Sequence, residues 1–134
     1  MMVAWWEQLL LVMGGGALGA AGRFLLDGWL TRQAGSGLPW GTLAANLIGA
    51  LIAGFLMVWL EVRGPGAVFW RALLIVGLLG GFTTFSAVMI ESLLLGRSAR
   101  LLDLGGYLGA TLVGGFALVW LGARIAYSLR GPIE

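Results

Sequence analysis

Long apolar segments alternate with short polar or glycine-rich segments along the whole chain. The apolar segments predict helices at about 5–30, 40–61, 69–95 and 103–127. Each holds about twenty residues or more, which is enough to cross a hydrocarbon core of about 30 Å with some tilt. The pattern therefore predicts an all-α membrane protein with four transmembrane helices, forming one membrane domain over residues 1–134.

The composition supports this fold class and excludes several functions. Of the 134 residues, 60% are hydrophobic and 10% are charged, which is more apolar surface than a soluble domain of this size can bury. The first apolar segment has no basic start, so we expect a retained helix rather than a signal peptide. The chain has no cysteine or histidine, which removes disulfides, thiol or histidine catalysis and the usual zinc ligands, so we expect no enzyme. The eight basic residues are dispersed arginines, so we expect no nucleic-acid partner.

Small side chains recur every four residues in three of the predicted helices, a spacing that lets neighbouring helices approach closely. The repeats are Gly15 and Gly19 beside Gly16 and Ala20; Gly41, Ala45, Gly49 and Ala53; and Gly106, Ala110 and Gly114. Arg23 and Asp27 also lie four residues apart near the end of the first helix, so they can form an ion pair. Alternatively, Arg23 extends to the membrane surface as a solvated charge.

The third apolar segment contains a stretch that is a poor continuous helix. Adjacent glycines at 80 and 81 precede three hydroxyl residues, Thr83, Thr84 and Ser86. We expect the helix to be broken there. Free backbone groups at membrane depth are tolerated only inside protein or beside water, so such a break is a candidate ion site. The alternative is a glycine-rich packing face whose hydroxyls bond back to the preceding turn.

Polar side chains inside the other apolar segments indicate a path for a small anion. Thr42 and Asn46 form a row beside the small residues of the second helix, and Thr111 lies deep in the fourth. An asparagine at this depth is costly unless it faces water or protein, so Asn46 either lines a pore or makes an interhelical hydrogen bond. An anion that leaves water needs donors, which the Asn46 amide, the hydroxyls of Thr42, Ser86 and Thr111, and an aromatic ring edge supply.

Arginine placement gives no preferred orientation in the membrane. With four spans, Arg63, Arg71, Arg124 and Arg130 lie at one side, and Arg23, Arg32, Arg97 and Arg100 lie at the other. Positive residues normally concentrate on the cytoplasmic side, so a balanced chain can insert both ways. Two oppositely inserted copies are related by a twofold axis in the membrane plane. We therefore expect an antiparallel, dual-topology homodimer.

Three features together resemble one known family. They are Gly41-Thr42-Leu43-Ala44-Ala45-Asn46-Leu47-Ile48-Gly49, then Gly80-Gly81-Phe82-Thr83-Thr84-Phe85-Ser86 followed by Glu91, and an early glycine-rich segment followed by Arg23. In this order, and in a chain of this length, they resemble the Fluc family of bacterial fluoride channels, also called CrcB proteins. The resemblance covers nearly the whole chain.

The resemblance implies a multi-pass protein of the bacterial inner membrane that exports fluoride passively through two pores at the interface of an antiparallel dimer. It also implies one central, structural sodium ion held by the backbone carbonyls of Gly80 and Thr83. The residues that it places along the fluoride pore are Asn46, Phe85, Thr42, Ser86, Tyr107, Thr111, Glu91 and Arg23.

The chain departs from the family pattern at two places in this pore. From the equivalent of Phe85, the family pattern usually continues with a hydroxyl residue, a second phenylalanine and a serine, whereas this chain has Ala87, Val88 and Met89. A further polar position of the fourth helix is Gly115 here. Either Phe85 alone carries the aromatic contact, or Val88 packs while Met89 or Phe82 fills the vacant space.

Two other functions also fit a small four-span protein. A dual-topology multidrug antiporter needs a carboxylate deep in the first helix, but Glu7 and Asp27 lie near its ends. A scaffold subunit that only holds partners through its glycine repeats needs neither a helix break nor Asn46. Fluoride efflux from liposomes separates these functions from a channel.

Overall fold

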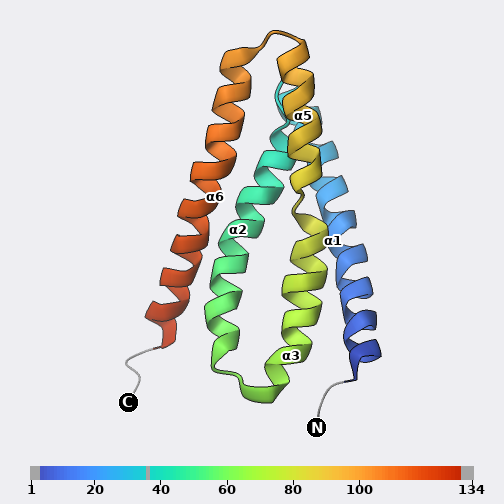
Figure 1. Cartoon of the computed structure of the whole chain (residues 1–134), viewed down its shortest axis with the longest axis vertical. Coiled ribbons are helices and arrows are strands. Elements are labelled where there is room, and N and C mark those ends of the chain that lie inside the picture. Colours follow the sequence, from blue (N-terminus) through green and yellow to red (C-terminus); the bar gives the residue numbers. More distant parts are fainter. Residues whose placement is uncertain (1–3, 36, 131–134) are drawn as a thin grey trace.

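The computed structural model describes residues 4–35 and 37–130, and it is helical apart from short connections (Figure 1). Two helices precede the third span: α1 (Trp5–Ala34) and α2 (Trp40–Glu61). The third span contains the 3-10 turn η1 (Gly64–Gly66), α3 (Ala67–Trp70), the π-helical segment η2 (Arg71–Leu79), α4 (Gly80–Phe82) and α5 (Phe85–Arg97). The last helix is α6 (Leu101–Arg130). Within these described residues, four helical spans are long and apolar enough to cross a membrane, which confirms this prediction.

The four spans run up and down, so the start of α1 and the end of α6 lie at the end of the bundle where α2 turns into α3 (Figure 1). α6 packs mainly on α2, and α1 packs mainly on η2 and to a lesser extent on α2 and α4. α1 continues past the predicted end at Leu30 to Ala34, which shortens the first loop. At about 1.5 Å per residue, the 30-residue α1 and α6 are each about 45 Å long, more than the hydrocarbon core requires.

Glycine allows backbone contact at both main helix pairs. A Cβ atom added at Gly19 of α1 would lie 2.8 Å from the amide nitrogen of Phe82, and one at Gly54 of α2 would lie 2.8 Å from the carbonyl carbon of Val119. Reciprocally, a Cβ at Gly122 of α6 would lie 2.9 Å from the Phe55 nitrogen. No side chain fits at these distances, so these glycines set how closely the helices approach.

The predicted small-residue repeats hold for α2 and fail for α6. Gly41, Ala45 and Gly49 are buried, although Gly54 rather than Ala53 is buried in the next turn. In α6, Gly106 and Ala110 are exposed, and the buried small residues are Gly122 and Ala126. The reason is that α6 packs closely on α2 through its second half, whereas a Cβ at Gly106 in its first half would meet nothing within 4 Å.

Helical hydrogen bonding stops in the middle of the third span. Thr83 (φ −86°, ψ 155°) and Thr84 (φ −152°, ψ 127°) are both extended, between the end of α4 and the start of α5. The two helical parts remain nearly in line, so residues 64–97 still form one span with a slight bend (Figure 1). The interruption comes after the glycine pair rather than at it, because Gly80 and Gly81 are helical.

The interior of a single chain is small. Val88, Leu95 and Tyr107 form its buried apolar cluster, with Leu38, Leu43, Leu104 and Leu108 packed around it. Among the described residues, no large side chain is fully buried, and most large apolar side chains are exposed. In water this surface would drive aggregation, whereas in a bilayer it contacts lipid tails or another apolar helix. The chain is therefore a multi-pass membrane protein.

Candidate functional site

The interruption is held open by Asn46 of α2. Its Oδ1 accepts a hydrogen bond from the Thr84 amide at 2.7 Å, and its Nδ2 donates to the Thr84 carbonyl at 2.9 Å. One side chain thus pairs both backbone groups of an extended residue, which replaces the bonds that a helix would supply. The Thr84 hydroxyl also accepts a bond from the Ala87 amide at 3.2 Å, so Thr84 is the N-cap of α5.

These two bonds leave two carbonyl groups without their helical donors. In a continuous helix, the Thr84 amide would bond to the Gly80 carbonyl, and the Ala87 amide would bond to the Thr83 carbonyl. In this structure those amides bond to Asn46 and to the Thr84 hydroxyl instead. The carbonyls predicted as cation ligands are therefore the two that lose these donors. In residues 4–35 and 37–130 no acidic or histidine cluster can hold a metal, so a cation here would depend on such oxygens.

Three predicted pore residues come together around one open cavity of about 400 Å³. Asn46, Phe85 and Thr111 line it, from α2, α5 and α6 respectively. The rest of its wall is Thr83, Thr84, Val88, Met89, Leu108 and Leu112. The Phe85 side chain is 75% exposed in the single chain. The cavity is therefore mostly apolar, with a few polar groups, and it lies on an outer face of the helix bundle.

Three other predicted residues form a second group, nearer the end of the bundle where α5 turns into α6. The Glu91 carboxylate accepts one hydrogen bond from the Thr42 hydroxyl at 2.6 Å and another from the Tyr107 hydroxyl at 2.5 Å. α2, α5 and α6 therefore meet at one carboxylate. Tyr107 is only 4% exposed and does not line the cavity beside Asn46. The Thr111 hydroxyl connects the groups, because it donates to the Tyr107 carbonyl at 2.7 Å.

The structure reduces the number of donors free for an anion. The hydroxyl hydrogens of Thr42 and Thr111 are already donated, to Glu91 and to the Tyr107 carbonyl. Asn46 uses one of its two N–H groups on Thr84, so one remains. The exposed Ser86 hydroxyl lies 3.3 Å from that of Thr84, where either group can donate. Beside the cavity, the free donors are thus one amide hydrogen, this hydroxyl pair and the edge of the Phe85 ring.

Arg23 lies apart from both groups. Its Nε donates to the Gly81 carbonyl at 3.3 Å, which connects α1 to the end of α4. The predicted ion pair with Asp27 is wrong, because the described residues form ion pairs only between Arg100 and Asp103 and between Arg130 and Glu61. The physical reason is that Asp27 packs against Gly41 of α2, while the Arg23 side chain turns to the Gly81 carbonyl of α4.

The position without the family's second aromatic ring is filled by packing. Val88 is 3% exposed and belongs to the buried cluster with Tyr107. Met89, not Phe82, lines the cavity beside Asn46. The Phe82 ring lies near Gly22 and Gly49 instead, between α1 and α2.

Sequence reasoning missed the roles of Thr84 and of the Gly81 carbonyl. Thr84 is both the residue bonded by Asn46 and the cap of α5. A threonine followed by a new apolar helix is an N-cap signal, so Thr84 could have been predicted. The Gly81 carbonyl has no side-chain signal, because backbone acceptors are invisible in a sequence.

Together, the four spans, the interruption in the third span and the polar groups around it define a small membrane protein with a candidate ion site of backbone groups and uncharged side chains. A family profile described as "CrcB-like protein, Camphor Resistance (CrcB)" matches residues 10–123. The chain belongs to the CrcB family, as its motifs predicted. This family and the relatives below are ion channels, not enzymes.

Several relatives carry a functional name. A protein of Xylella fastidiosa (strain M23) named Fluoride-specific ion channel FluC is 54% identical over 123 residues, which are 92% of each chain. A protein of the same name from Xanthomonas euvesicatoria pv. vesicatoria (strain 85-10) is 53% identical over 120 residues, 90% of each chain. Another, from Caulobacter sp. (strain K31), is 41% identical and covers 89% of this chain and 94% of its own.

Proposed function

We propose that this chain is the subunit of a fluoride-selective channel. The observation that carries the proposal is the cavity of about 400 Å³ at the interruption, because Asn46 and Phe85 in its wall belong to the motifs that resemble those of fluoride channels, and the named relatives are such channels. One Asn46 amide hydrogen and the Phe85 ring edge attract a small anion there, and no full positive charge lines the cavity to hold it too tightly. The Thr84 and Ser86 hydroxyls are the next donors along the chain.

The proposed transport is passive export from the cytoplasm across the bacterial inner membrane. In acidic surroundings fluoride is protonated to HF. Uncharged HF crosses the membrane and dissociates in the cytoplasm. With the interior about 100 mV negative, a monovalent anion is driven outward by about 2.3 kcal/mol, roughly fiftyfold at equilibrium. No coupling ion or energy source is then needed.

The proposed assembly is an antiparallel, dual-topology homodimer. Three predicted pore positions lie on an outer face of the single chain, since Phe85 and Ser86 are exposed and Thr111 is half-buried. In the first half of α6, a Cβ at Gly105, Gly106 or Gly109 would meet nothing within 4 Å. A second copy would cover this face and close the wall beside Phe85. The balanced arginines favour opposite insertion of the two copies.

We further propose that the interruption is a functional helix break that holds a structural sodium ion. Sodium is a hard cation that prefers oxygen ligands, and the carbonyls of Gly80 and Thr83, which lose the Thr84 and Ala87 amides as donors, offer such oxygens. When bound, the ion would supply fixed positive charge that joins two such breaks across the dimer. Within the chain, a Cβ at Gly80 would meet only the Ile75 carbonyl, at 3.9 Å. If Gly80→Val prevents dimer formation, the added side chain must clash with the second copy or with the bound ion. If Gly80→Val dimerises normally, the proposed sodium site at Gly80 is contradicted.

The experiment that tests the function is fluoride efflux from liposomes holding the purified protein, measured with a fluoride electrode. Fluoride efflux should start when a potassium ionophore is added, because potassium then leaves with the anion and no opposing voltage builds up. Chloride under the same conditions should stay inside. Fluoride retained at the rate of empty liposomes would contradict the proposal. Efflux that needs a proton gradient would favour the antiporter, and no efflux with an intact dimer would favour the scaffold.

A further inference from the structure

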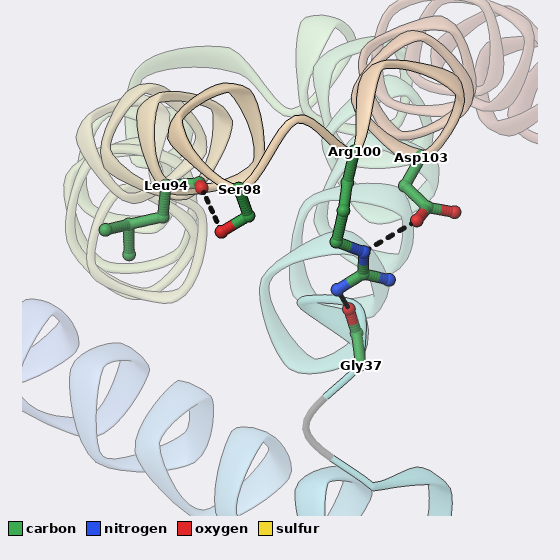
Figure 2. Close-up of polar contacts among 5 residues, drawn as sticks. All are labelled: Gly37, Leu94, Ser98, Arg100 and Asp103. Atoms are coloured by element: carbon green, nitrogen blue, oxygen red, sulfur yellow. Dashed lines mark hydrogen bonds and ion pairs between the residues drawn. The ribbon is translucent and has the colours of Figure 1, made fainter.

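Arg100 connects two parts of the chain that are distant in sequence (Figure 2). Its Nε donates to the Asp103 carboxylate at 2.8 Å, and its Nη1 donates to the carbonyl of Gly37. Asp103 lies in the first turn of α6, and Gly37 lies in the loop between α1 and α2. Arginine suits this role, because its planar fork presents several donors in fixed directions at once.

The turn that carries Arg100 is itself well fixed. α5 ends with two backbone bonds, from the Ala99 amide to the Gly96 carbonyl and from the Arg100 amide to the Leu95 carbonyl, each 3.1 Å. Ala99 has a φ of 54°, in the left-handed region that usually favours glycine. This geometry directs the chain from α5 into α6 and places the start of the Arg100 side chain.

The loop has no comparable second attachment. Among the described residues, the backbone bonds of residues 35 and 37–39 are all local: Gly35 to Thr31, Trp40 to Leu38, and Leu43 to Pro39. Within the described chain, the bond from Arg100 is the one polar contact between these loop residues and a segment distant in sequence. Arg100 therefore restrains how the loop enters α2.

The restraint acts directly beside the Glu91 group. Thr42 lies in the first turns of α2, just after the loop, and Tyr107 lies one turn after Asp103 on the same side of α6. Both donate to Glu91. A cavity of about 250 Å³ has Arg100 and Glu91 in its wall, together with Gly37, Leu38, Pro39 and Ser98 among others. The Arg100 guanidinium and the Glu91 carboxylate thus both belong to residues that line this cavity.

We propose that Arg100 is a positioning residue for ion conduction. It fixes the loop before α2 against the start of α6, so that Thr42 and Tyr107 meet the same carboxylate, and it thereby keeps the cavity beside Glu91 open to ions. The role in conduction rests on the fluoride channel proposed above. The role in placing Tyr107 does not, because it concerns only the geometry of this chain.

The test combines fluoride flux with a local spectroscopic signal. The chain has two tyrosines, so labelling with 3-fluorotyrosine gives two 19F resonances, and Tyr127→Phe assigns them. Arg100→Gln should shift the Tyr107 resonance, as should Glu91→Gln, and leave that of Tyr127 in place. Flux should fall about tenfold to a hundredfold, the effect of losing one charge-assisted hydrogen bond. The matched control is Arg97→Gln, an exposed arginine of the same turn, which should change neither signal nor flux.

Arg100→Lys separates geometry from charge. Lysine keeps the positive charge but cannot hold two partners in a fixed fork, so its flux and its Tyr107 shift should lie close to those of Arg100→Gln. Wild-type behaviour of Arg100→Lys would overturn the proposal, because charge alone would then suffice. An unmoved Tyr107 resonance in Arg100→Gln, equal shifts of both tyrosines, or unchanged flux would each overturn it too. If the wild type carries no fluoride, the proposed function fails, while the tyrosine signals still decide whether Arg100 places Tyr107.

Discussion

Gly19 offers a direct test of how α1 holds the third span. A Cβ there would lie 2.8 Å from the Phe82 amide nitrogen, 3.0 Å from the Leu78 carbonyl carbon, and nearer still to the Leu78 carbonyl oxygen. These are backbone atoms, which cannot rotate away as a flexible side chain can. Gly19→Ala therefore forces α1 outward from η2 and α4.

The expected loss of stability follows from two opposing terms. Overpacking at a close contact costs about 1–3 kcal/mol. Replacing glycine by alanine inside a helix returns about 0.5–1 kcal/mol. The net loss should be about 1–2 kcal/mol, which lowers the ratio of folded to unfolded protein by about fivefold to thirtyfold. Leu78 and Phe82 flank Gly80, so the displacement should also lower fluoride flux per folded protein.

Gly14→Ala is the matched control, because a Cβ at Gly14 of the same helix meets nothing within 4 Å. It gains the same helix propensity without the clash, so its stability should equal or slightly exceed that of the wild type. The assay is the thermal unfolding midpoint in a mild detergent, followed by flux from liposomes. A Gly19→Ala midpoint at or above that of Gly14→Ala would refute the idea that backbone contact sets the distance between α1 and the third span.

Three further outcomes are expected. In liposomes, Phe85→Ile should lose most fluoride flux because the ring edge is a main anion contact; flux near wild type, whatever Val88→Phe does, would exclude an essential ring. Asn46→Asp keeps the acceptor for the Thr84 amide but loses both N–H groups, so flux should be abolished, and retained flux would remove Asn46 as an anion donor. A cysteine at exposed Gln33 in this cysteine-free chain should be labelled from both faces of intact cells, whereas labelling from one face alone would contradict dual topology.

The number and extent of the spans could be predicted because lipid imposes a length and an apolar composition on each helix. The site was predictable only in part. Asn46 stood out because a buried amide is costly, but its partner is the Thr84 backbone, which no side chain reveals. Thr42, Glu91 and Tyr107 were each named as pore residues, yet their meeting depends on how α2, α5 and α6 cross. The way in which these helices cross depends on close backbone contacts such as that between Gly54 and Val119. The periodicity of small residues in the sequence suggests such contacts but does not identify the partner residue.

The interruption in the third span gives one physical origin to both proposed ion sites. The side chains of Asn46 and Thr84 take up two amides, of Thr84 and Ala87, that a helix would have bonded to Gly80 and Thr83. The carbonyls left over point to a cation, because oxygen lone pairs without donors are cation ligands. The same Asn46 retains one unused N–H beside the exposed Phe85 ring, and these two groups are the proposed anion contacts. A change that restored the helical bonds at Thr84 should therefore remove the two sites together.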